Sequence, residues 1–243
     1  MTQPFLSIIL PAHNEENRLP ETLKQIEKYL DSQNFESELI IVENASSDST
    51  FSLANEFASR VPNCRVLREP VPGKGNAVRT GMLAARGAYR FVCDADLSMS
   101  IDQVNVFLPP QRDGYDIAIG SREAPGAQRI DEPAYRHLIG RVFNTMVRWL
   151  TLPGLQDTQC GFKCFTAQAA ETLFPLQRMN GWTFDVEILA IALRRGYKVV
   201  EVPIRWKYFP GSKVNVIRDS LRMAMDLLTI RRRLRKGEYD PQA

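Results

Sequence analysis

The feature that most constrains the fold is a series of short apolar runs that alternate with segments of helical periodicity. Strand candidates lie at residues 5–10, 38–43, 65–69, 89–93 and 116–120, and the cores of four of them are SIIL, LIIV, FVC and IAI. Runs that are apolar on both faces of a strand are typical of parallel sheets covered by helices. Between the first two strands, Leu23, Ile26 and Leu30 recur at helical spacing. The alternation predicts an α/β fold with a doubly wound, mostly parallel sheet.

The second half of the chain has a different pattern. Residues 121–133 are polar, contain Pro and Gly and show no periodicity, which predicts a long, mobile loop. Helices are expected at residues 135–150, 167–174, 184–195 and 215–235, and a further strand at residues 198–203. The last helix combines an apolar stripe with an arginine cluster at 231–233. We therefore expect a main α/β domain, residues 1–212, followed by a basic amphipathic C-terminal helix and tail, residues 213–243.

Composition and charge exclude several classes of protein. Of the 243 residues, 44% are hydrophobic and 24% are charged, which argues against wholesale disorder. The net charge of +3 is too small to indicate nucleic-acid binding by itself. Neither a spanning helix nor a cleaved signal peptide is expected, because no apolar run reaches about 18 residues and no basic leader precedes the first strand. Four cysteines without a zinc pattern fit a reduced, cytosolic chain.

Polar loops follow four of the expected strands, at residues 11–15, 43–48, 73–75 and 94–96. Ligands of an open parallel sheet bind beyond the carboxyl ends of its strands, so these loops should lie together. The chain lacks both the G-x-G-x-x-G fingerprint of dinucleotide sites after its first strand and the Walker pattern. Lys74, between two glycines before a helix, could place a cation and backbone N–H groups near an anion, or could lie in solvent in a plain loop.

Asp94 and Asp96 directly follow an apolar strand. Two carboxylates two residues apart can share a hard divalent cation with a bound diphosphate, and Mg²⁺ takes one or two protein carboxylates in such sites. The alternative is that Asp96 or Ser98 caps a helix. At this position in the sheet we favour a metal and phosphate site.

Several cations could hold a second anionic group. Arg122 follows the fifth strand, and Arg136 and Arg141 lie five residues apart on the helix at 135–150. Arginine suits bidentate phosphate binding, although solvated arginines near a loop are the alternative. Lys213 could likewise neutralise phosphate or lie in solvent.

Five motifs, SIILPAHNEEN, ELIIVENASSDST, GKGNAVRTGMLAARG, FVCDADL and IAIGSR, occur in this order and resemble family 2 glycosyltransferases of the GT-A fold. Three further stretches make the resemblance more specific: QDTQCGFKCF, GWTFDVEIL and the W…GSK segment at 206–213. They resemble dolichyl-phosphate β-glucosyltransferases and, more loosely, dolichyl-phosphate mannose synthases and bacterial polyprenyl-phosphate glycosyltransferases. The likeness covers about residues 5–215.

The resemblance implies roles for individual residues. With Lys74, the nucleotide-sugar site comprises Pro11, Asn14, Glu15, Glu43, Asp48 and Asp94, and the metal ligands are Asp94 and Asp96. The acceptor site comprises Arg122, Arg136, Arg141, Gln159, Trp182 and Lys213, and the catalytic set is Asp94, Asp96, Arg122 and Asp185. The family often has two adjacent aspartates where this chain has Glu43 and Asn44. Asp185 could instead complement a helix dipole, and Trp182 could pack on the core.

The expected reaction is the inverting transfer of a hexose, with glucose from UDP-glucose as the expected donor, onto a polyprenyl or dolichyl phosphate with Mg²⁺ or Mn²⁺. A phosphate monoester already presents an anionic oxygen at neutral pH, so this acceptor needs cations and no base. The alternatives are a GDP-mannose donor, a soluble hydroxyl acceptor with Asp185 as the base, a sugar-nucleotidyl transferase, and a non-catalytic nucleotide-binding module.

The last helix has two possible roles. Its apolar stripe could cover the core of the domain, or its basic face could lie on an anionic membrane. A lipid-linked acceptor favours the second role, because its phosphate lies in the headgroup layer of the membrane. We therefore expect a peripheral enzyme on the cytoplasmic face of a membrane, and no nucleic-acid partner.

Overall fold

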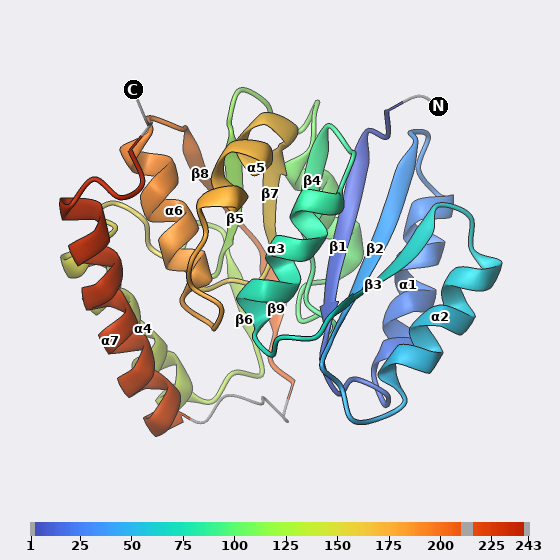
Figure 1. Cartoon of the computed structure of the whole chain (residues 1–243), viewed down its shortest axis with the longest axis horizontal. Coiled ribbons are helices and arrows are strands. Elements are labelled where there is room, and N and C mark those ends of the chain that lie inside the picture. Colours follow the sequence, from blue (N-terminus) through green and yellow to red (C-terminus); the bar gives the residue numbers. More distant parts are fainter. Residues whose placement is uncertain (1–2, 210–215, 241–243) are drawn as a thin grey trace.

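A seven-stranded sheet runs through the centre of the molecule in the order β3-β2-β1-β4-β7-β5-β8 (Figure 1). The computed structural model describes residues 3–209 and 216–240, apart from the side chains of residues 136, 138, 139, 143 and 216–221. The strands are β1 Leu6–Ala12, β2 Ser37–Asn44, β3 Cys64–Glu69, β4 Tyr89–Val92, β5 Ile117–Ser121, β7 Lys163–Thr166 and β8 Val199–Pro203. Only β7 runs antiparallel to its neighbours in this sheet. The predicted mostly parallel α/β sheet is confirmed.

Helices cover both faces of the sheet, which explains the uninterrupted apolar runs. The helices are α1 Leu19–Asp31, α2 Thr50–Arg60, α3 Lys74–Ala84, α4 Ala134–Leu150, α5 Ala167–Leu173, α6 Phe184–Arg194 and α7 Val216–Arg235, with short 3-10 turns at Ile101–Phe107 and Phe174–Leu176. Ile9 of β1 packs in one core with Met82 of α3. Its neighbours Ile8 and Leu10 pack in the other core with Ile26 of α1. Successive side chains of a strand point to opposite faces, so each face has its own apolar core.

Three short strands were not predicted from the sequence. β7 was not predicted, because its four residues KCFT include a lysine and are too few to show a period. The expectation of a loop without strands at 121–133 was wrong, since β6, Gln128–Ile130, pairs in parallel with β9, Arg205–Lys207. Arg129 of β6 forms ion pairs with Glu123 and Glu132, so charge pairing within the segment supports it. Neither interaction leaves a periodic signal in the sequence.

α7 packs beside α4 and α6 at one end of the sheet (Figure 1). Leu227 and Ile230 of α7, and Tyr239 after it, are fully buried in the same core as the side chains of α6. Part of the apolar stripe of α7 therefore covers the core of the protein. The predicted boundary after residue 212 falls at residues 210–215, outside the described part of the chain, and stays a prediction. None of the described helices combines the length and the apolar character needed to cross a membrane.

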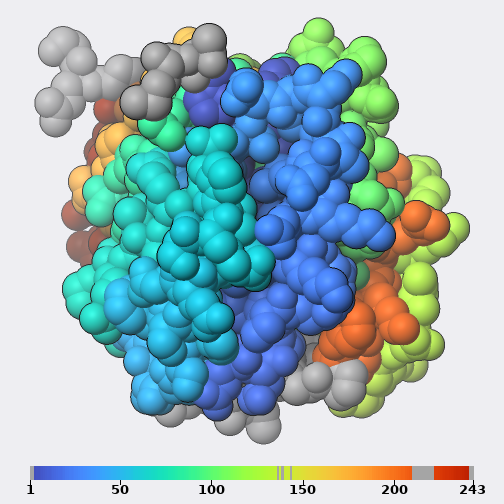
Figure 2. Space-filling view, turned by 90° about the vertical axis from the view of Figure 1, so that its right-hand side faces the viewer, coloured from blue at the N-terminus to red at the C-terminus, as the bar shows by residue number. Residues whose placement is uncertain are grey.

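The blue and cyan first third of the chain covers the opposite edge of the molecule (Figure 2). There, a buried carboxylate at the start of β2 joins neighbouring segments. Glu38 Oε1 accepts hydrogen bonds from Ser7 Oγ and from the backbone N–H of Arg86, each at 2.7 Å. Its Oε2 lies 3.0 Å from Arg65 Nη2 and 3.2 Å from Arg86 Nη2. Burial alone would raise the pKa of Glu38, but these hydrogen bonds and the charge of Arg65 bring it below its usual value.

We expect Glu38→Gln to lower the free energy of unfolding by about 1–3 kcal/mol at neutral pH, because a buried charged hydrogen-bond network is lost. The folded-state pKa lies below the unfolded one, so the carboxylate stabilises the fold above the unfolded pKa. That contribution disappears as the pH falls through the folded pKa. Urea unfolding of both proteins across this acidic range should show the difference shrinking with falling pH. A difference independent of pH would contradict the proposed ionic role of Glu38.

Candidate functional site

A cleft of about 830 Å³ opens beyond the carboxyl ends of β1 and β4, between the start of α3 and the helices α4, α6 and α7. Its lining includes ten predicted site residues, which are Pro11, Asn14, Glu15, Lys74, Asp94, Asp96, Arg122, Gln159, Trp182 and Asp185. They come from segments up to 174 residues apart in the sequence. The sheet brings these segments to one edge, as its topology leads one to expect.

Glu43 and Asp48 lie outside the lining of this cleft and shape its loops. Glu43 is buried, where its Oε1 accepts from the backbone N–H of Ser46 at 2.5 Å and its Oε2 lies 3.1 Å from Arg68 Nε. Asp48 Oδ1 accepts from the backbone N–H of Thr50 at the start of α2, at 2.9 Å. Its Oδ2 accepts from the backbone N–H of Glu16 at 3.2 Å. Their predicted contacts with the nucleotide stay predictions.

Of the three remaining predicted acceptor residues, the structure describes the side chain of Arg141. On α4, Gly140 and Asn144 line the cleft, whereas Arg141 is exposed and lies outside the lining. The side chain of Arg136 and all of Lys213 are outside the described part of the structure. Instead, α7 contributes Arg222 to the lining. Arg222 was not among the predicted site residues, although it is one of the basic residues of the predicted last helix.

The acidic pair predicted to hold a metal lies beside a lysine. Lys74 Nζ, from the first turn of α3, is 2.6 Å from Asp94 Oδ1 and 5.3 Å from the ring centre of Trp182. Burial lowers the pKa of Lys74, but the charges of Asp94, Asp185 and Asp96 outweigh this effect and raise it. Burial and the charge of Asp94 raise the pKa of Asp96. Lys74 therefore lies within the field of three carboxylates and reduces their mutual repulsion.

Two glycines hold Lys74 in place through close backbone contacts. Gly73 has a φ of +140°, and a Cβ there would lie 2.3 Å from the carbonyl oxygen of Asn180. Gly75 donates its N–H to the same carbonyl at 2.9 Å. Any side chain at Gly73 would collide with this backbone and would also need an unfavourable conformation. The glycines thus fasten the start of α3 to the loop that precedes α6.

Asp94 is also confined on its other side. A Cβ at Gly161 would lie 1.7 Å from Asp94 Oδ2, so only glycine leaves room for the carboxylate there. Asp96 Oδ1 accepts from the backbone N–H of Ser98 at 3.0 Å within a turn. That hydrogen bond engages one carboxylate oxygen of Asp96. The next helical segment begins at Ile101 with Ser100 as its N-cap, so the alternative that Asp96 or Ser98 caps a helix was wrong.

A buried lysine that was not among the predicted site residues pairs with Asp185 of the cleft. Lys163 Nζ is 2.8 Å from Asp185 Oδ1 and donates to the carbonyl of Cys160. The side chain of Lys163 is only 3% exposed. Burial raises the pKa of Asp185, although the charges of Lys163 and Lys74 oppose the shift. A lysine inside an apolar stretch was the available signal, but the strand that carries it was not predicted.

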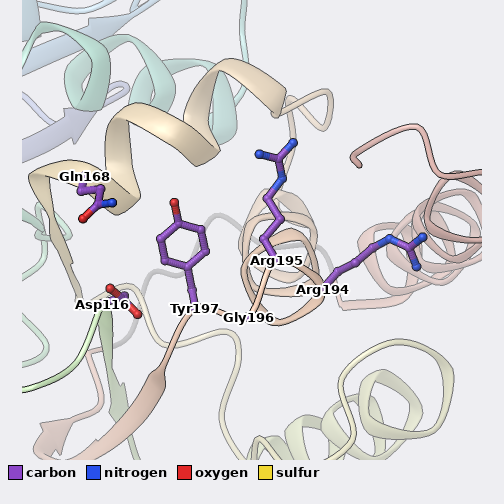
Figure 3. A pocket seen from close by; sticks show the side chains of 6 residues that line it. All are labelled: Asp116, Gln168, Arg194, Arg195, Gly196 and Tyr197. Atoms are coloured by element: carbon purple, nitrogen blue, oxygen red, sulfur yellow. The ribbon is translucent and has the colours of Figure 1, made fainter. Parts of the chain in front are cut away.

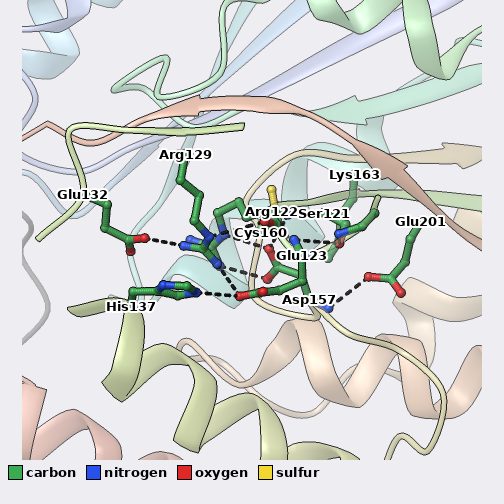
Figure 4. A network of polar contacts seen from close by, with 11 residues as sticks. Ser121, Arg122, Glu123, Arg129, Glu132, His137, Asp157, Cys160, Lys163 and Glu201 are labelled. Atoms are coloured by element: carbon green, nitrogen blue, oxygen red, sulfur yellow. Dashed lines mark hydrogen bonds and ion pairs between the residues drawn. The ribbon is translucent and has the colours of Figure 1, made fainter. Parts of the chain in front are cut away.

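Arg122 is held by a buried carboxylate in the network of Figure 4. Asp157 Oδ2 is 2.7 Å from Arg122 Nε and Oδ1 is 2.9 Å from Nη2. Burial would raise the pKa of Asp157, but the Arg122 charge and hydrogen bonds lower it below its usual value. Glu201 Oε1 accepts from the backbone N–H of Asp157 at 3.0 Å. The bidentate pair fixes the guanidinium at the cleft, where it also lies 5.3 Å from the ring centre of Trp206.

The donor set fits a hard divalent cation that substrate oxygens help to hold. Among the described residues, no group of three or more His, Cys, Asp or Glu side chains is arranged to bind a metal. The protein would supply the carboxylates of Asp94 and Asp96, and a diphosphate and water would supply the other ligands. Gln159 adds a polar atom suited to a ligand, because its buried Nε2 has no hydrogen-bond partner within the described structure.

A second cavity, of about 510 Å³, lies near the amino ends of β5 and β8 (Figure 3). It contains none of the predicted site residues. Its charged side chains are engaged locally, since Arg194 Nη2 lies 2.7 Å from Asp240 Oδ2 and Arg195 Nη2 donates to the carbonyl of Tyr239 at 2.8 Å. These contacts fasten the residues after α7 to the end of α6.

Solved structures of similar shape carry a related fold. Glucosyl-3-phosphoglycerate synthase from Mycobacterium tuberculosis, in complex with Mn²⁺, UDP-glucose and glycerol 3-phosphate, superposes with a TM-score of 0.65 and 19% identity. The match covers 94% of this chain and 80% of that one. This likeness confirms the expected GT-A fold.

Relatives in sequence are more similar. The dolichyl-phosphate beta-glucosyltransferase of Dictyostelium discoideum is 34% identical, over 96% of this chain and 76% of that protein. The human protein of the same name is 32% identical over 96% and 77%, and the Drosophila melanogaster protein is 37% identical over 93% and 74%. Residues 7–174 match the family described as Glycosyl transferase family 2. The chain is therefore a glycosyltransferase and belongs to glycosyl transferase family 2.

Proposed function

We propose that this glycosyltransferase transfers glucose from UDP-glucose, with inversion, onto a dolichyl or other polyprenyl phosphate. The observation that carries the proposal is the placement of Asp94, Asp96 and Lys74 together in a cleft at the carboxyl edge of the sheet. This edge is where a doubly wound sheet binds nucleotides. The names of relatives at 32–37% identity support glucose as the sugar and a dolichyl phosphate as the acceptor.

The donor half of the site would bind and activate the diphosphate. Asp94 and Asp96 would hold Mg²⁺ or Mn²⁺, which supplies a Lewis acid for the departing diphosphate. Lys74 opens α3, so its ammonium and the helix N-terminus both favour an anionic group. The glycine contacts with Asn180 keep this end of α3 in position.

The acceptor half would hold a second anion beside the first. Arg122, oriented by Asp157, and Arg222 both line the cleft and would attract the acceptor phosphate. The phosphate oxygen is anionic at neutral pH, so it can attack the anomeric carbon without losing a proton to a base. In this reaction Asp185, paired with Lys163, would order the base of the cleft.

A soluble hydroxyl acceptor is the second candidate, because one observation favours it. Asp185 lines the cleft and burial raises its pKa, as a general base for a hydroxyl requires. GDP-mannose remains the alternative donor, although the sequence relatives described above are named as glucosyltransferases. The basic α7 would let the enzyme lie on the cytoplasmic face of a membrane as a peripheral protein.

Incubation with labelled UDP-glucose, polyprenyl phosphate and Mg²⁺ or Mn²⁺ should yield an extractable glucolipid, and GDP-mannose should not replace UDP-glucose. Asp96→Asn should reduce the rate by at least ~100-fold, because a carboxylate ligand of the cation is lost. Asp102→Asn is a matched control outside the cleft lining. Label found only in a water-soluble product would refute the lipid acceptor, and a near-normal rate of Asp96→Asn would remove it as a ligand.

Asp185→Asn distinguishes the two acceptors. Loss of a general base costs ~10²–10⁴-fold, so transfer to a hydroxyl should collapse. Transfer to a phosphate should fall by less than ~10-fold, since no proton has to be removed. The rates are compared at temperatures below the melting point of each protein, because the change leaves the Lys163 charge without its partner. A ~10²-fold loss with the phosphate acceptor in the folded variant would favour Asp185 as a base there too.

Lys74 should compete with the cation at Asp94 when no nucleotide is bound, because the ammonium lies 2.6 Å from Oδ1. Lys74→Met should therefore bind Mn²⁺ more tightly without UDP, by ~10-fold or more, where each factor of ten corresponds to 1.4 kcal/mol. Electron paramagnetic resonance of free Mn²⁺ measures this directly. Lys24→Met, an exposed position on α1, is the control. Equal or weaker Mn²⁺ binding by Lys74→Met would contradict the competition.

A further inference from the structure

Exposed apolar side chains form a stripe along α4. Tyr135, Val142 and Trp149 are 62%, 65% and 85% exposed. They are spaced by seven residues, so they lie within about 40° of one another around the helix. Single exposed apolar residues are ordinary on a protein surface, but an aligned row of three large ones marks an interaction face.

The adjoining helix α7 divides its apolar residues between the core and the outside. Leu227 and Ile230 are buried, whereas Met225 and Leu228 are 62% and 58% exposed. α4 and α7 pack against each other at the same end of the sheet (Figure 1). The exposed rows therefore belong to two neighbouring helices of one surface region.

This region is strongly basic. α4 has three arginines and neither Asp nor Glu, and α7 has six arginines and two aspartates. The two helices thus carry a formal charge of +7, whereas the whole chain carries +3. Arg141, Arg148 and Arg232 are exposed beside the apolar rows. Basic residues next to large apolar ones suit the headgroup layer of an anionic membrane.

The same helices border the cleft with their other faces. Gly140 and Asn144 of α4 line it, and so do Arg222 and Asp226 of α7. Asp226 accepts a hydrogen bond from Thr183 Oγ1 at the start of α6. Contact between these helices and a bilayer would therefore place the lipid surface next to the cleft.

We propose that α4 and α7 together form a membrane-contact face, comprising Tyr135, Arg141, Val142, Arg148, Trp149, Met225, Leu228 and Arg232. Its apolar side chains enter the boundary between headgroups and acyl chains, and its arginines contact anionic lipid headgroups. α4 supplies the larger apolar row, so anchoring does not depend on α7 alone. The inference deepens the proposed function, since a lipid-linked acceptor would give this face its purpose, but lipid binding can be measured without donor or acceptor.

The 243-residue chain is tested with sucrose-loaded vesicles of phosphatidylcholine, with and without phosphatidylglycerol. It should sediment with the anionic vesicles, and added salt should weaken the binding because surface charges are screened. Val142→Ser with Trp149→Ser should lower the partition coefficient by ~10–100-fold, as expected for withdrawing two apolar side chains from lipid. The control is Val71→Ser, which is 53% exposed outside this face. Arg148→Gln with Arg232→Gln should lower binding only to the anionic vesicles.

Brominated lipids test whether Trp149 enters the bilayer. They should quench part of the tryptophan fluorescence of the wild type, and Trp149→Phe should bind vesicles but lose that quenching. Equal vesicle binding by the wild type and the Val142→Ser, Trp149→Ser protein would overturn the proposal. The proposal would also be overturned if neither protein binds vesicles and analytical ultracentrifugation shows a wild-type dimer that dissociates in this variant.

Transfer to a short-chain polyprenyl phosphate in detergent separates this inference from the proposed function. The Val142→Ser, Trp149→Ser variant should keep that activity, because neither residue lines the cleft. Vesicle binding without any glucosyl transfer by the wild type would refute the proposed function and leave the membrane face standing. Transfer by the wild type without vesicle binding would refute the membrane-contact face and leave the proposed function standing.

Discussion

Alternating charges held away from bulk water are the interaction on which the site depends. Lys74 forms an ion pair with Asp94 and also interacts with the charge of Asp185. Asp185 is in turn paired with Lys163. Without the two lysines, Asp94, Asp96 and Asp185 would repel one another in a partly desolvated space, and each lone charge would be costly to bury. The close backbone contacts of the glycines at the start of α3, and of Gly161 with Asp94, keep these side chains in position. An anionic substrate therefore enters a site whose acidic groups already have cations beside them.

The sheet and the acidic loop were predictable because they follow from strong local patterns. Uninterrupted apolar strands indicate burial on both faces, and topology then brings Asp94 and Lys74 to one edge. Lys163 and Arg222 were not predictable in the same way. The strand of Lys163 has only four residues, and its partner Asp185 is 22 residues away. Which face of α7 turns Arg222 toward the cleft depends on tertiary packing that the helical period alone does not determine.

The second half of the chain combines binding and support in the same elements. α7 buries Leu227 and Ile230 while Arg222 and Asp226 line the cleft. Within α6, Glu187 is fully buried and accepts from the Tyr239 hydroxyl at 2.6 Å and from the backbone N–H groups of Arg178 and Met179 in the loop before α6. That loop also receives the glycines of α3. Because these contacts are continuous, the position of α7 is mechanically linked to the loop that holds Lys74.

Because β7 runs antiparallel to its neighbours, residues that precede a strand can also contribute to the site at the carboxyl edge of the sheet. In a sheet with only parallel strands, this edge is reached by segments that leave a strand. Lys163 opens β7 and pairs in register with Val92 at the end of β4, so the chain arrives at the same edge before it enters the strand. Asp157, Gln159 and Gly161 thereby meet groups that follow β4 and β5. Because one strand is antiparallel, segments that precede a strand and segments that follow a strand line the same cleft.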